Sequence, residues 1–182
     1  MQITYDKKNI LTRCSEAELE LMVIIRHASF DDVAAIYAMT QVAYAEYRAL
    51  LPHSSVWHET PQTIAAEMKL GPIMLSEVDG RVVGSVRCHV DHEEGKGDFM
   101  YIHRLAVLPD YRRQGLGCAL VQAVEDLSKS LNLHRVRLEI RAAQPENCYF
   151  YLKLGYKSGE ISAYLPDGSP RSYWMSKVLK FD

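Results

Sequence analysis

YIHRLAVLPDYRRQGLG, residues 101–117, is the stretch of the chain that says most about the fold. The segment 99–108 is apolar and rich in strand-forming residues, and the Pro-Asp pair after it ends the predicted strand. Leucine and valine then recur at helical spacing over residues 116–131, so a helix is predicted to begin inside the glycine-containing loop. The sequence therefore predicts a strand, a short turn, a basic loop and a helix in direct succession.

The loop between this strand and this helix has the composition of an anion site. The first backbone N–H groups of a helix have no partners inside the helix, and they carry partial positive charge. Gly115 and Gly117 let a ligand approach the backbone, and Arg112 and Arg113 add full charges. We therefore expect a phosphate or pyrophosphate here. The loop has neither the G-x-G-x-x-G pattern of dinucleotide folds nor the Gly-Lys-Ser/Thr of a P-loop.

Two motifs in order resemble the GNAT superfamily of acyl-CoA-dependent N-acetyltransferases. RRQGLG at residues 112–117 is similar to the family's R/Q-x-x-G-x-G/A signature, and LAV at residues 105–107 stands just ahead of it, as in that family. FYLKLGY at residues 150–156 resembles the family's Y-x-x-x-G-F/Y element. The resemblance covers roughly residues 23–178. It implies a single domain of this type over residues 22–182, with residues 1–21 as an N-terminal extension.

The composition fits one globular domain. The chain has 182 residues, of which 48% are hydrophobic and 24% charged, and its net charge is −2. This charge does not indicate a nucleic-acid footprint, no apolar run is long enough to span a membrane, and the N-terminus lacks a signal-peptide layout. Cys14, Cys88, Cys118 and Cys148 form no C-x-x-C pair, so reduced thiols are expected. We therefore expect a cytoplasmic protein that binds neither nucleic acid nor membrane.

Periodicity and turn signals predict the remaining elements. The predicted strands are 22–26, 73–78, 82–90, 99–108, 135–141, 156–164 and 172–179, and the predicted helices are 31–44, 60–70, 116–131 and 145–154. Their order predicts an α/β protein with a mixed sheet and helices on both faces. The resemblance implies a mostly antiparallel sheet of about seven strands, the acyl-CoA N-acyltransferase fold.

The resemblance also implies where acetyl-CoA, the cosubstrate, binds, and it implies no metal. The pantetheine arm would pair with the backbone of residues 105–107, in a gap between strands 102–108 and 137–141, and one N–H there would polarise the thioester carbonyl. The pyrophosphate would sit on the N–H groups of residues 113–117. One amide side chain at the start of helix 145–154 would bond the cofactor's amides. The implied cofactor-binding residues are Leu105, Ala106, Val107, Arg112, Arg113, Gln114, Gly115, Leu116, Gly117, Gln144 and Asn147.

Three residues are candidates for proton transfer. Tyr151 matches the family's tyrosine that protonates the departing CoA thiolate, and an unperturbed phenol, with a pKa of ~10, can protonate a thiolate whose conjugate acid has a pKa of ~8.5. His103 is the first candidate for the base that deprotonates the amine, because histidine titrates near neutrality. Glu139 is the second, and a water molecule is the third. Tyr101 occupies a position where many members of the family have a glutamate.

The acceptor is predicted only as a primary amine. An aromatic and histidine-rich region and the last hairpin supply the candidate substrate residues Tyr44, Trp57, His58, Tyr101 and Tyr164. Small amines, amino acids, polyamines, drugs and protein N-termini all remain open. A homodimer through the apolar strand 172–179 is also predicted.

Two classes of function are compatible with these motifs. The first is an N-acetyltransferase that moves an acetyl group from acetyl-CoA to a primary amine by direct attack in a ternary complex. The alternative is a non-catalytic acetyl-CoA-binding sensor or interaction module. Tyr151 and the intact glycine loop favour the enzyme.

Overall fold

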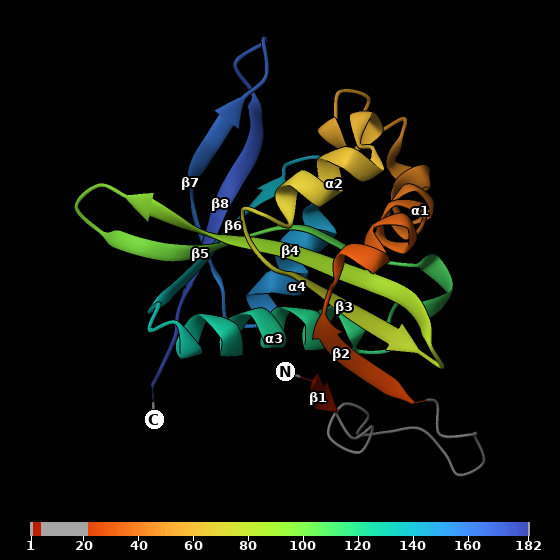
Figure 1. Ribbon diagram of the computed structural model, residues 1–182. Coiled ribbons are helices and arrows are strands. Elements are labelled where there is room, and N and C mark those ends of the chain that lie inside the picture. Colours follow the sequence, from red (N-terminus) through yellow and green to blue (C-terminus); the bar gives the residue numbers. More distant parts are fainter. Residues whose placement is uncertain (1, 5–21, 182) are drawn as a thin grey trace, which may run out of the picture. The chain divides into compact units, whose positions relative to one another are not determined.

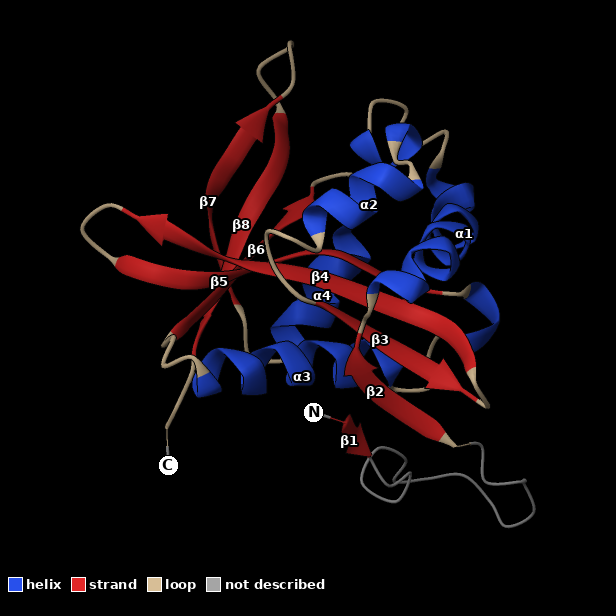
Figure 2. Ribbon diagram, viewed as in Figure 1, coloured by secondary structure: helices blue, strands red, loops and turns tan. Residues whose placement is uncertain are grey.

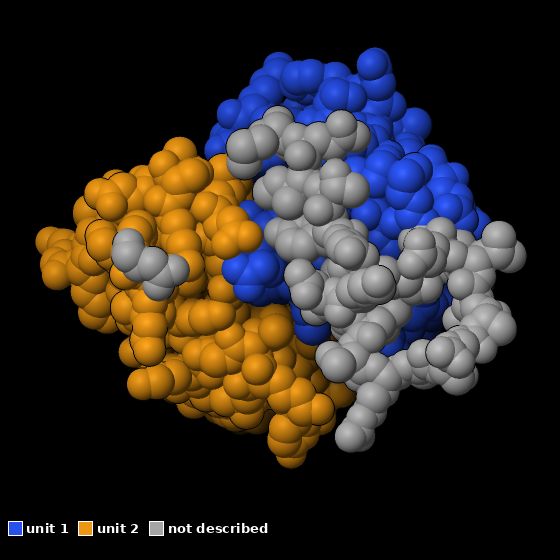
Figure 3. Space-filling view, turned by 90° about the horizontal axis from the view of Figure 1, so that it is seen from below, with its two compact units in different colours: residues 1–87, 104–123 blue, residues 88–103, 124–182 orange. Residues whose placement is uncertain are grey.

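The computed structural model describes residues 2–4 and 22–181 (Figures 1 and 2). These residues divide into two compact units (Figure 3). Unit 1 comprises Met1–Arg87 and Arg104–Ala123, and unit 2 comprises Cys88–His103 and Val124–Asp182. Two strands and one helix contribute residues to both units. The expectation of one domain over residues 22–182 stays a prediction, and most of the proposed extension 1–21 lies outside the described residues.

The strands of unit 1 pair in the order β1-β2-β3-β4-β5. Strands β1 (Gln2–Thr4), β2 (Val23–His27) and β3 (Ile73–Val78) run antiparallel to their neighbours, as does β4 (Arg81–Glu93) to β3. An Asp-Gly turn joins β3 to β4. Both turn residues are left-handed, with φ of +50° at Asp79 and +79° at Gly80, as a two-residue hairpin requires.

Two helices of unit 1 pack on these strands. Helix α1 (Val33–Tyr44) follows a single 3₁₀ turn, η2 (Phe30–Asp32), and α2 (Pro61–Glu67) begins with proline at its first position. Thr60 caps α2, because its hydroxyl accepts from Thr63 N at 3.2 Å and Thr63 Oγ1 accepts from Thr60 N at 2.9 Å. One buried cluster joins both helices to β3 through Ile36, Ile64, Ile73 and Leu75.

In unit 2 the strands pair in the order β4-β5-β6-β8-β7. Strand β5 (Gly97–Val107) is parallel to β6 (Arg135–Arg141), whereas β8 (Pro170–Val178) is antiparallel to β6 and to β7 (Lys157–Tyr164). Helix α4 (Pro145–Lys153) contacts β6 and β7. The buried side chains of this unit include Met100, Ile102, Val124, Val136, Leu138, Ile140, Tyr151, Tyr156 and Met175.

The predicted fold class is confirmed. The sheet is mixed and mostly antiparallel, and the predicted order of strands and helices is correct. Strands β2 to β8 are the seven expected ones, and β1 is an additional strand from the N-terminal segment. Among the described residues, no helix has the length and apolar character needed to cross a membrane.

The predicted strands 82–90 and 99–108 are shorter than the observed ones, because the polar segment 92–98 lies outside both predictions. Strand β4 continues to Glu93 and β5 begins at Gly97, so the two form a long hairpin. Polar pairs hold its end, since His92 Nδ1 lies 2.7 Å from Asp98 Oδ1 and Lys96 Nζ lies 2.8 Å from Glu93 Oε1. The His92–Asp98 pair joins the two strands, and the Lys96–Glu93 pair lies at the turn. These polar residues show no apolar alternation, which explains why periodicity did not predict this end of the hairpin.

Three cysteines of the described part of the chain form no disulfide bond. They are Cys88, Cys118 and Cys148, while Cys14 lies outside the described residues. Burial raises the pKa of Cys88 to about 12, so this thiol is protonated at neutral pH.

Candidate active site

The last residues of β5 belong to unit 1, and they turn one edge of the strand away from β4. Leu108 N donates to the Val83 carbonyl of β4 at 2.8 Å. Backbone groups alternate between the two edges of a strand, so the N–H and C=O groups of Leu105 and Val107 face the edge opposite β4. That edge is the one to which an extended ligand chain would add as a further strand.

The loop that follows β5 has a backbone suited to anions. Arg113 has a φ of +61° and Gly115 a φ of +82°, so left-handed residues alternate with ordinary ones ahead of α3 (Leu116–Ser130). Successive N–H groups in such an alternation converge into a concave anion site, called a nest. Ala119 N donates to Gly115 O at 3.0 Å, and the N–H groups of residues 116–118 come before it and have no acceptor within the helix. The predicted phosphate loop therefore has the required array of donors.

Arg112 uses its side chain within unit 1. Its Nε donates to Val107 O at 3.0 Å, one terminal nitrogen donates to Ala43 O at 2.9 Å, and the other pairs with Glu46. This hydrogen bond lowers the pKa of the Glu46 carboxyl. The guanidinium thus fastens the loop to β5 and α1. Arg113, in contrast, is exposed and carries its charge at the surface of the loop.

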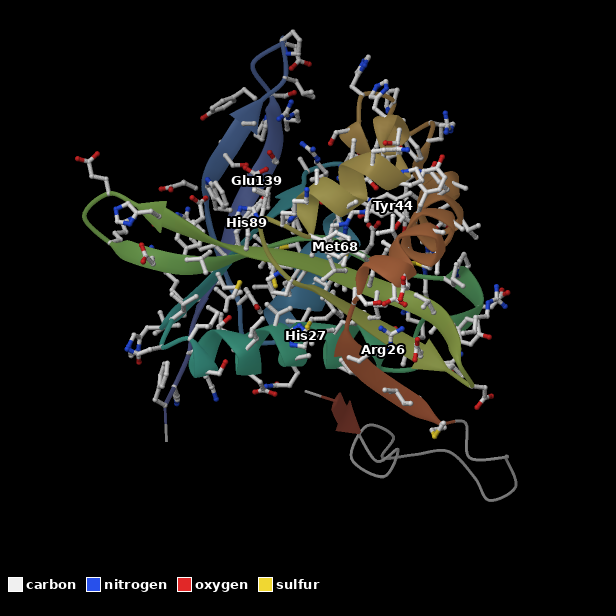
Figure 4. The ribbon with its side chains drawn as sticks, viewed as in Figure 1. Arg26, His27, Tyr44, Met68, His89 and Glu139 are labelled. Atoms are coloured by element: carbon white, nitrogen blue, oxygen red, sulfur yellow. The ribbon has the colours of Figure 1, made fainter. Side chains whose placement is uncertain are left out.

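Tyr44, a predicted substrate residue, lies beside the same strand. It is the last residue of α1, and its hydroxyl donates to Leu105 O at 3.4 Å (Figure 4). Its ring contacts the ring of Tyr47 with centroids 6.4 Å apart. The structure therefore brings Tyr44 to the predicted cofactor strand.

Trp57 and His58 lie in η4 (Ser55–His58), a 3₁₀ helix between the predicted helices 31–44 and 60–70. Trp57 Nε1 donates to Leu51 O at 2.6 Å, and the Arg48 guanidinium lies 4.5 Å from the centre of the indole. These contacts fix the half-buried indole within its own loop. His58 is exposed.

In unit 2, four rings gather on one face of the sheet. Tyr101 and His103 stack with centroids 5.7 Å apart at 14°. His89 of β4 meets both rings, at 5.3 Å from Tyr101 and 5.4 Å from His103, and Trp174 of β8 meets Tyr101 at 5.9 Å. Tyr101 and His103 therefore lie on the same face of β5, and we call these four residues the ring cluster.

Glu139 lies on the same face of unit 2. It is the register partner of Trp174, and Tyr101 is the register partner of Arg137, two residues before Glu139 on β6. The Arg137 guanidinium lies 4.2 Å from the centre of the Trp174 ring and 2.6 Å from Glu93 Oε2. The two candidate bases, His103 and Glu139, thus share one polar face, whose opposite side is the apolar core of the unit (Figure 4 labels His89 and Glu139).

Tyr151 is buried, with 7% of its surface exposed. Its ring contacts Phe150 at 4.9 Å and Tyr156 at 5.4 Å between centroids. Burial, together with the nearby Glu125 carboxylate, raises the pKa of Tyr156, so the neighbouring phenol stays protonated. Tyr151 is therefore a tyrosine held in a fixed orientation by other rings.

The other predicted residues of unit 2 lie at the ends of elements. Gln144 is buried at the start of α4, and Asn147 N donates to Gln144 O at 3.1 Å. Tyr164 ends β7 and is exposed. In the described part of the chain, no three His, Cys, Asp or Glu side chains come together as metal ligands.

Sequence reasoning missed several participants in these clusters. His89 and Trp174 belong to the ring cluster, Arg137 lies over the Trp174 ring, and Arg104 and Glu59 form an ion pair in unit 1. A signal exists for His89 alone. In a hairpin that turns between Glu93 and Gly97, counting back along both strands places position 89 opposite position 101.

Comparison with known proteins places the chain in a family. Residues 36–156 match the model of the acetyltransferase (GNAT) family. An N-alpha-acetyltransferase of Sulfurisphaera tokodaii is 28% identical over 169 residues, which cover 85% of this chain and 92% of that protein.

Solved structures show the same fold. Ard1 from Thermoplasma volcanium superposes with a TM-score of 0.68 at 26% identity, covering 87% of this chain and 99% of the other. Arabidopsis thaliana Naa50, solved with the bisubstrate analogue CoA-Ac-MVNAL, gives a TM-score of 0.65 at 20% identity and covers 86% and 99%. The donor loop after β5, the buried tyrosine of α4 and these likenesses agree, and the chain belongs to the acetyltransferase (GNAT) family and is an acyltransferase.

Proposed function

We propose that this protein transfers the acetyl group of acetyl-CoA to the α-amino group of a peptide or protein. The observation that supports the use of acetyl-CoA is the array of backbone donors at residues 113–117, in the loop that follows β5. The acceptor class rests on the similarity to an N-alpha-acetyltransferase over most of both chains. It narrows the range of amines that the sequence alone leaves open.

The cofactor side of the reaction is assigned to unit 1. The N–H groups of residues 113–117 bind the pyrophosphate, and the charge of Arg113 adds to their attraction. The N–H groups of Leu105 and Val107 pair with the pantetheine arm and polarise the thioester carbonyl. A donor aimed at the developing oxyanion typically contributes about 10²–10³-fold in rate.

The proton transfers are assigned to unit 2. The acceptor arrives as an ammonium ion, and His103 takes one of its protons, with Glu139 or a water molecule as the alternative. The amine nitrogen then attacks the carbonyl carbon, and the carbon–sulfur bond breaks. Tyr151 gives its proton to the CoA thiolate. The attacking nitrogen loses its second proton to water, from which the Tyr151 phenolate is reprotonated, so the products are a neutral amide and CoA. Gln144 is buried at the start of α4, and we assign to it the amide contact with the cofactor.

A screen of acceptors tests this function. Purified protein is incubated with acetyl-CoA and peptides that differ in their first residue, beside free amino acids, polyamines and small aromatic amines. We expect thiol release and the mass increase of one acetyl group with a subset of the peptides. Each peptide carries an internal lysine, and a formyl-blocked copy is the control. Acetylation of the blocked copies, or of free amines alone, would contradict the α-amino assignment.

A further inference from the structure

Arg104 has an unusual backbone for a residue inside a strand. It lies within β5, directly before Leu105, yet its φ is +53°. Residues other than glycine seldom adopt the left-handed region, because the Cβ atom crowds the backbone there. A conformation of this kind persists only where surrounding contacts hold it. The contacts that hold Arg104 therefore also fix the direction in which β5 continues.

Those contacts are side-chain bonds to the segment before α2. Arg104 Nε donates to Glu59 Oε1 at 2.6 Å, and a terminal nitrogen donates to Ser55 Oγ at 2.7 Å. Ser55 opens η4, and Glu59 follows its last residue. One guanidinium thus joins the turn in β5 to both ends of η4.

The Glu59 carboxylate has a second arginine partner. Arg87 of β4 donates to Glu59 Oε1 at 2.9 Å and to Oε2 at 2.8 Å, and it also donates to Glu67 Oε2 of α2 at 2.7 Å. Arg87 is 2% exposed and Glu59 8% exposed. Burial acts to lower the pKa of Arg87, but the bonds to Glu59 and Glu67 outweigh it and raise the pKa.

The four charges of this network balance as two cations and two anions. Buried charges are tolerated when each is paired and hydrogen-bonded, and every charge of this network has a partner of opposite sign. The two carboxylates differ in one respect, since both contact Arg87 but only Glu59 contacts Arg104. A substitution of Glu67 therefore tests the contribution of the network to stability, whereas a substitution of Glu59 also tests its contribution to the placement of β5.

We propose that Glu59 is a positioning residue for acetyl transfer, acting through Arg104. It holds the left-handed turn of β5 and thereby sets the direction of the Leu105 and Val107 N–H groups. The same carboxylate fixes the end of η4, which carries Trp57 and His58. This inference rests on the proposed function, because it assumes that those N–H groups contact the thioester.

Two substitutions at carboxylates give the first test. In Glu59→Gln we expect kcat, measured with a peptide that the wild type acetylates, to fall about tenfold or more, because small displacements of a positioned group are costly. The Kd of acetyl-CoA should change less, since the phosphate loop is untouched. The matched control Glu67→Gln removes a charge from the same network, and it should lower the Tm while leaving kcat within about twofold. Equal effects of both variants on kcat would overturn the proposal.

Two substitutions at Arg104 give a second test that leaves Arg87 paired. Both Arg104→Ala and Arg104→Gly remove the link to Glu59, but glycine adopts a φ of +53° without strain. We expect the glycine variant to retain a higher kcat than the alanine variant, and Glu59→Gln to add little to Arg104→Gly. Equal activities of the two Arg104 variants would mean that Arg104 does not act by holding the turn.

Hydrogen exchange separates failure of this inference from failure of the proposed function. Without ligand, the backbone amides of residues 104–108 should exchange faster in Glu59→Gln and Arg104→Ala than in the wild type, and not faster in Glu67→Gln. This holds even if the wild type acetylates no peptide, an outcome that sinks the proposed function alone. Unchanged exchange in Glu59→Gln would refute the positioning role directly.

Discussion

At the scale of single residues, the Tyr151 ring is held by contacts with two other aromatic rings. A substitution that keeps the ring therefore tests the hydroxyl group alone. Tyr151→Phe removes one hydroxyl and keeps the ring that contacts Phe150 and Tyr156. We expect kcat to fall by about 10²–10⁴-fold, the usual scale of a lost general acid, while Tm and acetyl-CoA affinity stay close to the wild type. Steady-state kinetics and thermal shift provide the measurement.

Tyr149→Phe is the control for this substitution. Tyr149 lies two residues earlier on the same helix, and its side chain is 67% exposed. Tyr149→Phe therefore removes the same hydroxyl group from a position that faces solvent. Its kcat should match the wild type. Full activity in Tyr151→Phe would remove the phenol from the mechanism.

His103 and His89 permit a comparison of two neighbouring imidazoles. His103→Gln keeps hydrogen bonding but does not take up a proton near neutrality. If His103 is the base, kcat/KM should lose its decline on the acidic side, in the pH range where histidines titrate. His89→Gln, 5.4 Å away in ring contact, should keep that decline. A pH profile that is the same in His103→Gln and the wild type would pass the role to Glu139 or to water.

At the scale of elements, β2 and the start of α1 are joined by charge. The Arg26 guanidinium lies 2.7 Å from the Asp32 carboxylate and also contacts Glu77. The hydrogen bond from Arg26 lowers the pKa of Asp32 to about 2. The folded pKa lies below the unfolded value of ~3.9, so the stabilisation is complete above that value and is lost as the pH falls towards 2. Asp32→Asn should therefore cost about 1 kcal/mol at pH 7, because the pair is partly solvated, and little near pH 2.

Urea unfolding at both pH values measures this difference. Asp31→Asn is the matched control, since Asp31 is the exposed neighbour in the same turn. A loss of stability in Asp32→Asn that does not depend on pH would assign the effect to helix capping instead of the ion pair.

The glycine loop can be tested against another left-handed glycine. Gly115→Asp puts a carboxylate where we place the pyrophosphate, and aspartate tolerates positive φ better than most residues. We expect loss of acetyl-CoA binding by calorimetry, with the fold retained. Gly168→Asp is the control, because Gly168 has a φ of +84° on the exposed hairpin between β7 and β8 and nothing near its Cβ position. Equal affinity in both variants would place the cofactor elsewhere.

The homodimer is predicted from the apolar surface of strand 172–179, and the structure shows that part of this surface is used within unit 2. β8 lies between β6 and β7 within unit 2, so its backbone is paired on both sides. Met175 is fully buried in the unit's own core. Less apolar surface is therefore left for a partner than the sequence indicates, and the homodimer stays a prediction for light scattering.

Most elements could be predicted because their signals are local. Strand β6 begins and ends at the predicted residues, and α4 is bounded by Pro145 and by Gly155, whose φ is +87°. The left-handed turn at Arg104 has no such signal, since arginine gives no local hint of positive φ. It depends on Glu59, 45 positions earlier, which periodicity does not reveal.

The candidate site was predicted unevenly for the same reason. Motif positions single out Tyr151 and the glycine loop, whose roles stay predictions, and the structure stacks Tyr101 on His103. The side chain of Arg112 shows the limit. The motif suggests that it binds an anion, but its contacts with Ala43 and Glu46 of another element are invisible until the chain is folded.

For the whole molecule, the family match runs through both compact units. Residues 36–156 include the phosphate loop of unit 1 and Tyr151 of unit 2, so the proposed chemistry draws on residues from each. Everything proposed about catalysis requires that this chain bind acetyl-CoA through an electrostatically favourable loop.

Thermal shift of the wild-type protein with acetyl-CoA, CoA, ATP and NAD tests this requirement most directly. We predict that acetyl-CoA and CoA raise the Tm, because a ligand that binds only the folded state stabilises it. The shift should shrink as salt rises from about 0.05 to 0.5 M, since screening weakens the attraction between phosphate and loop. A shift with NAD alone, or with none of the four ligands, would contradict the assignment of residues 112–117 as the acetyl-CoA site.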